Sequence, residues 1–171
     1  MRSKLLLTCA IGAWLAGTPF MWMTAIKNFE TVDNILAAQP SGFEFVTEPL
    51  SDDDLREAMR YQASEVNRLF FDGWGWTQLA IGLVAAVLAW RSGSGKVVLG
   101  CVVAALAIAI YLQMVAVPGT IRLGRLIDFG RGGVEETAAF LRYHHTYTGL
   151  DMAKFVLLLL ATGVVALRRQ T

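Results

Sequence analysis

Side chains that could build a binding site are concentrated near the end of the chain. Phe140, His144, Tyr147, Asp151 and Lys154 follow one another at steps of four, three, four and three. This spacing places them in one stripe along a helix. Ionisable groups in a membrane are costly, so they usually face other helices and find partners there. We therefore expect Lys154 to pair with Asp151 or with Asp72.

A second stripe of the same spacing is formed by Asn67, Phe71, Trp74 and Gln78. At 1.5 Å per helical residue, the polar residues of three apolar segments lie roughly 20–28 Å from the basic residues that flank those segments. The sequence therefore predicts one polar level, in the outer third of a bilayer. The candidate ligand-binding residues are Asp72, Gln78, Gln113, His144, Tyr147, Asp151 and Lys154. The candidate helix-contact residues are Asn67, Arg68, Trp74, Arg122 and Arg125.

Two interpretations of this level stay open. In one, the charges are interfacial anchors: Lys154 extends its ammonium group outward, and Asp72 and Asp151 are in water. In the other, they lie near the floor of a polar cavity that opens to the outer side.

The sequence gives little support to metal or catalytic chemistry. His144 and His145 are the only histidines, and adjacent helical residues point about 100° apart, so a bis-histidine haem within one chain is excluded. A His–Met haem or a Cu(I) site would use His144 and Met114, its weak candidates. Methionine is also ordinary packing material. We expect no resident metal or cofactor. We also expect no enzyme, because the sequence has no nucleophile elbow, phosphate loop, H-E-x-x-H or Cys-x-x-Cys motif.

Four apolar runs must position these residues. They cover residues 5–26, 70–90, 97–117 and 150–167 of a chain that is 55% hydrophobic, with a mean hydropathy of +0.49. Each run approaches or exceeds the length of a membrane-spanning helix. The prediction is an all-α integral membrane protein of one domain (1–171). It is an up-down-up-down four-helix bundle, and its helices extend beyond the outer surface through connections 27–69 and 118–149.

Local signals mark the ends of these helices. Ser51 is a good cap for a helix that begins with three aspartates, and Glu135 and Glu136 suit the start of the last helix. The third run meets Pro118-Gly119, where we expect a kink.

The charge distribution predicts an orientation. Six of the 15 basic residues, and none of the 14 acids, lie at the two termini and in the short turn after residue 90. By the positive-inside rule both termini are cytoplasmic, and the multi-pass protein is expected in the cell membrane, by default a bacterial inner membrane. The first run reads as an uncleaved anchor rather than a signal peptide. No basic stretch suggests nucleic-acid binding.

The pattern Phe140-x-x-x-His144, the Asn67-Arg68 pair and Pro118 resemble a group of small bacterial four-span membrane proteins of unknown function. This chain departs from that group in its acidic segment between Gln39 and Glu57. The resemblance implies a fold and no activity.

Three functions follow as hypotheses. The first is a non-catalytic accessory or assembly subunit, whose partners are the lipid bilayer and either other membrane subunits or further copies of this chain. The alternative is a small-ligand binding or transport module with a polar cavity open to the outer side. The third is a haem- or copper-binding redox protein.

Overall fold

The protein is all-helical over the residues that the computed structural model describes, namely 2–40, 43, 47 and 50–167. The main helices and the two short helical turns are α1 (Arg2–Ala38), α3 (Asp52–Arg91), α4 (Lys96–Tyr111), the π-helical turn η1 (Leu112–Ala116), α5 (Val117–Ile127), the 3₁₀ turn η2 (Asp128–Gly130) and α6 (Val134–Leu167). Four helical stretches are long and apolar enough to cross a membrane: α1, α3, the stretch from α4 to η2, and α6.

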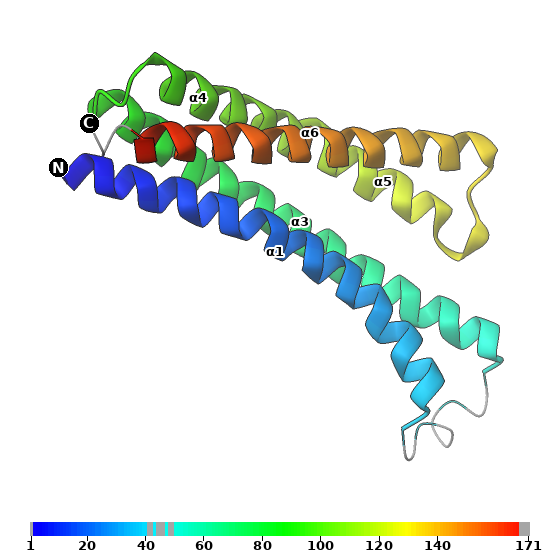
Figure 1. The fold of residues 1–171 in the computed structure, drawn as a ribbon. Helices are drawn as coiled ribbons and strands as arrows, with labels where there is room; N and C mark the ends of the chain where they lie inside the picture. Colours follow the sequence, from blue (N-terminus) through cyan, green and yellow to red (C-terminus); the bar gives the residue numbers. More distant parts are fainter. Residues whose placement is uncertain (1, 41–42, 44–46, 48–49, 168–171) are drawn as a thin grey trace.

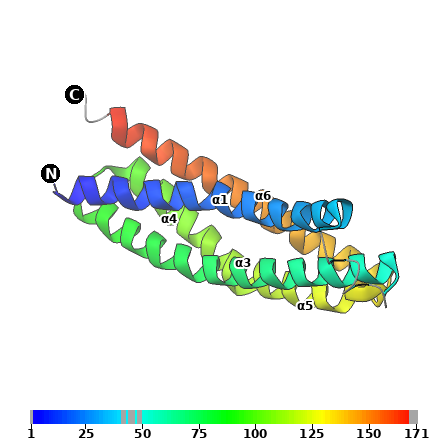
Figure 2. The same ribbon diagram turned by 90° about the horizontal axis from the view of Figure 1, so that it is seen from below.

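The helices form two pairs that diverge toward one end of the molecule. Figure 1 shows the two termini and the turn between α3 and α4 at one end, which we call the inner end. The connection after α1 and the turn between α5 and α6 lie at the opposite, outer end. There α1 separates from α6, while α3 stays in contact with α5 and η2 as far as Tyr61; nearer the inner end all the helices pack together. Figure 2 shows the same long, narrow body from below.

The predicted helix starts are confirmed. The Ser51 side chain accepts a hydrogen bond from the Asp54 amide at 3.2 Å, which caps α3. Glu136 accepts one from the Gly133 amide at 3.0 Å, just before α6. Such bonds satisfy amides that have no partner within a helix's first turn. Of the basic residues predicted at the inner end, Arg168 and Arg169 lie outside the described residues.

The expected kink at Pro118 takes a different form. The helix continues past this proline, and η1 forms directly before it. Proline has no amide hydrogen and its ring clashes with the carbonyl four residues back, and a π turn relieves the clash because it widens the backbone. The extra residue also moves the buried stripe by one position, so Leu112 and Gln113 are both buried although they are adjacent.

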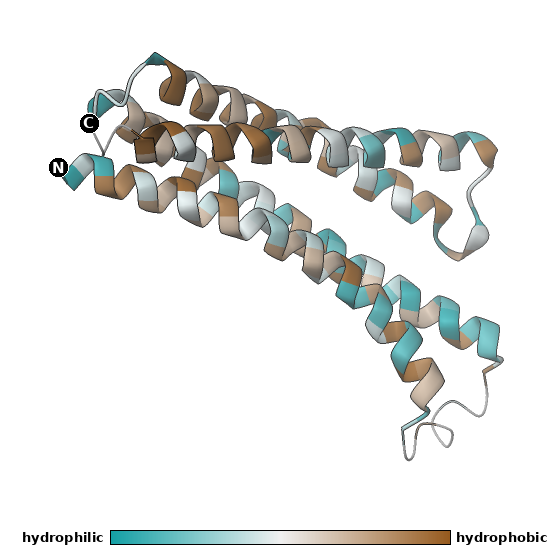
Figure 3. Ribbon diagram, viewed as in Figure 1, coloured by the Kyte–Doolittle hydropathy of each residue, from teal (hydrophilic) through white to brown (hydrophobic). Residues whose placement is uncertain are grey.

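The inner half is held by apolar packing around small residues. Its buried core lies on all four spans: Leu7, Ile11, Trp14, Ala85, Ala89, Val98, Val102, Ala105, Ala109, Leu158 and Ala161. Figure 3 shows that hydrophobic residues dominate the inner ends of α4 and α6, and that hydrophilic residues gather on the outer ends of α1 and α3. A side chain added at Gly82 would meet the Trp14 ring at 2.6 Å, and one added at Gly17 would meet the Trp74 ring at 2.1 Å. Helices in membranes approach closely at such small residues.

A pair of glycine substitutions in α1 tests this packing. Gly17→Ala should destabilise the protein by about 1–3 kcal/mol, because its methyl group would overlap the Trp74 ring. Gly12→Ala has open space around it, so it should be neutral or stabilising by up to about 1 kcal/mol through helix propensity. Thermal unfolding of both variants in the same detergent measures the difference. Equal melting temperatures would contradict the proposed contact.

Candidate functional site: a buried ion pair beneath an outer cavity

The centre of the site is a buried ion pair within α6. The Lys154 ammonium donates to Asp151 Oδ1 at 2.5 Å and to Gln78 Oε1 of α3 at 2.6 Å. Lys154 is 0% exposed and Asp151 is 1% exposed. The predicted pairing of these two residues is therefore confirmed. The interpretation of Lys154 and Asp151 as solvated anchors is wrong, because neither reaches solvent.

Two tryptophans of α1 complete the cluster. Trp22 Nε1 donates to Asp151 Oδ2 at 2.7 Å, and Trp14 Nε1 donates to Gln78 Oε1 at 3.3 Å. Each indole thus satisfies an acceptor that belongs to another helix. We call Trp14, Trp22, Gln78, Asp151 and Lys154 the buried cluster. It connects α1, α3 and α6 at a single level of the bundle.

Asp72 does not join this cluster, contrary to one of the two pairings expected. It lies six residues before Gln78, so in a regular helix the two side chains point about 120° apart. Asp72 is exposed and accepts a hydrogen bond from Gln113 Nε2 at 2.9 Å. Gln113 Oε1 is buried against Gly75 without a hydrogen bond among the described residues.

A cavity of about 520 Å³ lies directly above the buried cluster, toward the outer end. Trp22 belongs to both, since its indole bonds Asp151 and its ring lines the cavity. All four helical spans contribute to the walls: Trp22, Ala25, Ile26 and Phe29 from α1; Ser64, Asn67, Arg68 and Phe71 from α3; Val117, Thr120 and Ile121 from α5; and Phe140, His144, Tyr147, Thr148 and Met152 from α6. Ten of these 16 residues are apolar or aromatic, as is usual for small-molecule sites of about 300–1,000 Å³.

Side-chain contacts close three of the four gaps between helices around the cavity. Asn67 donates to the Ala25 carbonyl at 3.2 Å and accepts from Asn28 at 2.8 Å, which joins α3 to α1. At the junction of α5 and α6, the Tyr143 ring lies where a side chain at Gly119 would be. Ion pairs join α3 to α5 and thereby close the third gap.

These ion pairs form an outer rim above the cavity. Arg68 donates to both carboxylate oxygens of Asp128, at 2.9 and 3.0 Å, and to Glu65 at 2.6 Å. Arg125 donates to Glu65 at 2.9 and 3.0 Å. The hydrogen bonds from Arg125 and then from Arg68 lower the pKa of Glu65 to about 2. Arg122, predicted to contact a helix, is exposed and makes none of the ion pairs found among the described residues.

The fourth gap, between α1 and α6, stays open above the buried cluster. The two helices touch at Trp22, which bonds Asp151 and packs against Phe155 with ring centres 5.5 Å apart. Beside this contact the lining residue Met152 is 46% exposed, and one turn farther out on α1 the lining residue Ile26 is 58% exposed. Figure 1 shows α1 leaving α6 in this region. The cavity is therefore accessible from the side of the bundle.

The remaining predicted site residues divide between cavity and exterior. Tyr147 is buried and packs edge-on against Phe71, while His144 lines the cavity and stacks on Phe140 at 5.9 Å. Partial burial, and then the neighbouring His145, lower the pKa of His144. Met114 is 51% exposed and does not line the cavity. No group of three potential metal-binding carboxylates, histidines or cysteines occurs among the described residues.

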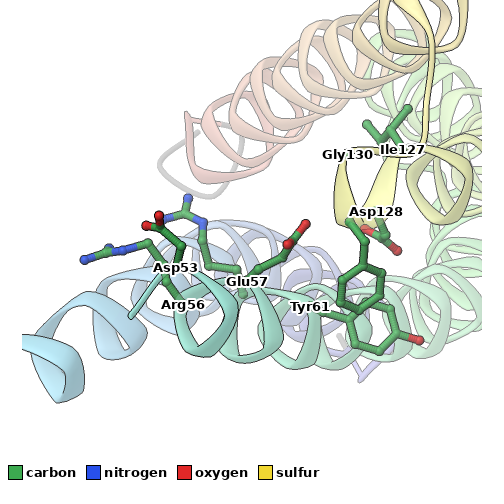
Figure 4. A pocket seen from close by; sticks show the side chains of 9 residues that line it. Asp53, Arg56, Glu57, Tyr61, Ile127, Asp128 and Gly130 are labelled. Atoms are coloured by element: carbon green, nitrogen blue, oxygen red, sulfur yellow. The ribbon is translucent and has the colours of Figure 1, made fainter. Parts of the chain in front are cut away.

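A second cavity, of about 360 Å³, lies at the outer end between α3 and η2. Figure 4 shows Asp53, Arg56 and Glu57 projecting from α3, with Tyr61 and Asp128 close together beside them. The three charged side chains from α3 belong to exposed residues. Groups that remain hydrated bind a small ligand weakly, so we take the cavity above the buried cluster as the candidate site.

Comparison with protein-family models, with curated proteins and with solved structures finds no match. The function must therefore be argued from the buried cluster and the cavity.

The buried ion pair predicts a strong dependence of stability on both partners. Lys154→Met should destabilise by about 3–5 kcal/mol, because it leaves the Asp151 carboxylate buried without its cation. Adding Asp151→Asn to Lys154→Met should restore much of this loss, since no buried charge then remains. Chemical unfolding in detergent measures both, with the exposed Asp72→Asn as the control of unchanged stability. A double variant no more stable than Lys154→Met would show that the charges are not the cause.

The outer rim predicts a stability loss in acid. The folded-state pKa of Glu65, about 2, lies below its ordinary value of 4.5. The stabilisation that ionised Glu65 gives the folded protein is therefore complete above pH 4.5. It is lost as the pH falls through about 2. The melting temperature of wild type should exceed that of Glu65→Gln at pH 6. This difference in melting temperature should disappear between pH 4.5 and 2. A difference in melting temperature that stays constant over this range would contradict the lowered pKa of Glu65.

Proposed function

We propose that this protein is a four-span membrane protein that binds a small, largely apolar ligand in the cavity above its buried cluster. The observation that supports this proposal is a 520 Å³ aromatic-lined space between four helices. Close packing is the norm in protein interiors, so a space of this size needs an occupant or a purpose. The spans would cross the membrane up-down-up-down, with both termini cytoplasmic and the cavity in the outer half. The distribution of basic residues supports this orientation, and the bacterial inner membrane remains our default location.

Binding is favoured over transport by what lies beneath the cavity. Trp22 forms its floor, and the buried cluster fills the space between α1, α3 and α6 below it. Farther inward, the bundle interior is the apolar core described above. A ligand that enters from the outer side therefore meets a sealed floor, and the described residues offer it no polar route across the bundle.

Binding is also favoured over catalysis. The charged groups near the cavity are engaged with one another: Lys154 with Asp151, and Arg68 with Asp128. A general base or nucleophile must be within reach of a substrate, and such groups are normally found in the wall of the site. Here the carboxylate of Asp151 lies behind Trp22. His144 does lie in the wall, but its side chain makes no hydrogen bond to a nucleophile or to an orienting carboxylate among the described residues.

An accessory-subunit role remains a second proposal, and a separate surface supports it. Phe129 at the outer end is 44% exposed and lies against the exposed Tyr61 at 4.8 Å between ring centres. Its backbone φ is 59°, a strained value for a bulky residue. Strained backbone conformations cluster at functional positions such as ligand clamps and switch regions, so we take Phe129 as the candidate contact residue. Co-purification with a stoichiometric membrane partner, lost in Phe129→Gly, would support this role.

A cavity-filling variant tests ligand binding. Ala25→Phe should occupy much of the cavity and abolish retention of an apolar probe, such as a spin-labelled alkyl chain, by purified protein. Ala104→Phe makes the same change on an exposed face of α4, so it should leave retention unchanged. Electron paramagnetic resonance of the immobilised probe measures both, and thermal unfolding checks that each variant is folded. Equal retention by the two variants would place the probe elsewhere.

A further inference from the structure

The polar groups of the cavity are arranged by height, and this arrangement limits what it can bind. The inner part is aromatic and apolar, with Trp22 as the floor and Phe71 in the wall. His144 lies seven residues outward of Asp151, or roughly 10 Å along α6. Ser64 lies 14 residues outward of Gln78, or roughly 20 Å along α3. An occupant therefore meets apolar surface at the inner end and hydrogen-bonding groups toward the outer end.

Most polar side chains of the wall are already engaged. Asn67 bonds Asn28 and the Ala25 carbonyl, and Thr148 donates to the His144 carbonyl. By contrast, none of the hydrogen bonds found among the described residues uses the side chains of His144 or Ser64, and both line the cavity. These two groups remain available to a ligand, as does the hydroxyl of the buried Tyr147, which none of those hydrogen bonds uses.

The charged side chains at the rim are all paired with one another, so none is free to bind a charged group of a ligand. Arg68 bonds two carboxylates and Glu65 bonds two guanidinium groups, so each charge has its counter-ion. The four side chains Glu65, Arg68, Arg125 and Asp128 sum to zero. A charged headgroup drawn into this space would lose its hydration without gaining a free counter-charge.

On these grounds we propose that the cavity takes an uncharged amphiphile from the outer leaflet, admitted sideways between α1 and α6. This proposal rests on the proposed function and names its ligand class. The apolar chain lies above Trp22, and a hydroxyl or carbonyl end bonds His144 and Ser64. Such a molecule enters with its polar end already at the outer side, which is the orientation of a lipid in that leaflet.

Photo-crosslinking in lipid nanodiscs tests this inference with three probes that share one saturated chain bearing a terminal diazirine. They are a monoacylglycerol (uncharged), a lysophosphatidylglycerol (anionic) and an alkyl trimethylammonium (cationic). The monoacylglycerol should label residues around Trp22 and Met152, at a yield at least about fivefold above either charged probe, because desolvating an unpaired charge is costly. Intact-mass and peptide mass spectrometry give the yield and the labelled residues.

Adjacent histidines provide the matched variants. His144→Ala and Ser64→Ala should each lower monoacylglycerol labelling by about three- to tenfold, the usual effect of losing one hydrogen bond. His145→Ala should not, because His145 lies on the same helix and does not line the cavity. All three residues are at least partly exposed, and thermal unfolding confirms that each variant is folded. An equal effect of His144→Ala and His145→Ala would overturn the role of His144.

The outcomes separate this inference from the function on which it rests. A charged probe that labels the same residues as well as the monoacylglycerol would overturn the ligand class and leave ligand binding intact. If no probe labels wild type above the level of the filled variant Ala25→Phe, both the ligand class and the proposed function fail.

Discussion

Lys154 and Asp151 share one buried level of an apolar bundle, and the rest of the structure depends on how their polar atoms are satisfied. Removing two charges from water is expensive, and their mutual attraction repays this only when further hydrogen bonds satisfy the remaining atoms. Those bonds come from Gln78 on α3 and Trp22 on α1. The need to satisfy one ion pair therefore fixes the height and rotation of three helices relative to one another.

The same constraint explains why the bundle opens only on one side of this level. Inward of the cluster, small residues such as Gly82 allow close helix contact, and the core is continuous. Outward of it, α1 and α6 have no further polar link among the described residues, and Figure 1 shows them diverging. The rim between Arg68 and Asp128 limits how far α3 and α5 separate. A cavity bounded below by Trp22 and above by the rim is the result.

Much of the fold followed from the sequence, and part of the site did not. Apolar run length predicts the four long helices, and an i,i+3 relationship on one stripe predicts the Asp151–Lys154 pair. The partners of these residues were harder to find, because Trp22 lies 129 positions from Asp151 and tryptophan is equally at home at a membrane interface. Arg68 and Asp128 are 60 positions apart without a local signal. The π turn before Pro118 rotates Gln113 inward, and regular helical periodicity cannot anticipate that.

Trp22 would couple the proposed ligand binding to folding. Its Nε1 group satisfies Asp151, while its ring is the surface on which a ligand would rest. A ligand that packs on the ring favours the rotamer that makes the hydrogen bond, and the hydrogen bond holds the ring in place for the ligand. Any molecule that binds only the folded form stabilises it by RT ln(1 + L/Kd), where L is its free concentration. The buried ion pair would then be most secure when the cavity is occupied, because above the apolar core the indole of Trp22 supplies the hydrogen bond that joins α1 to α6.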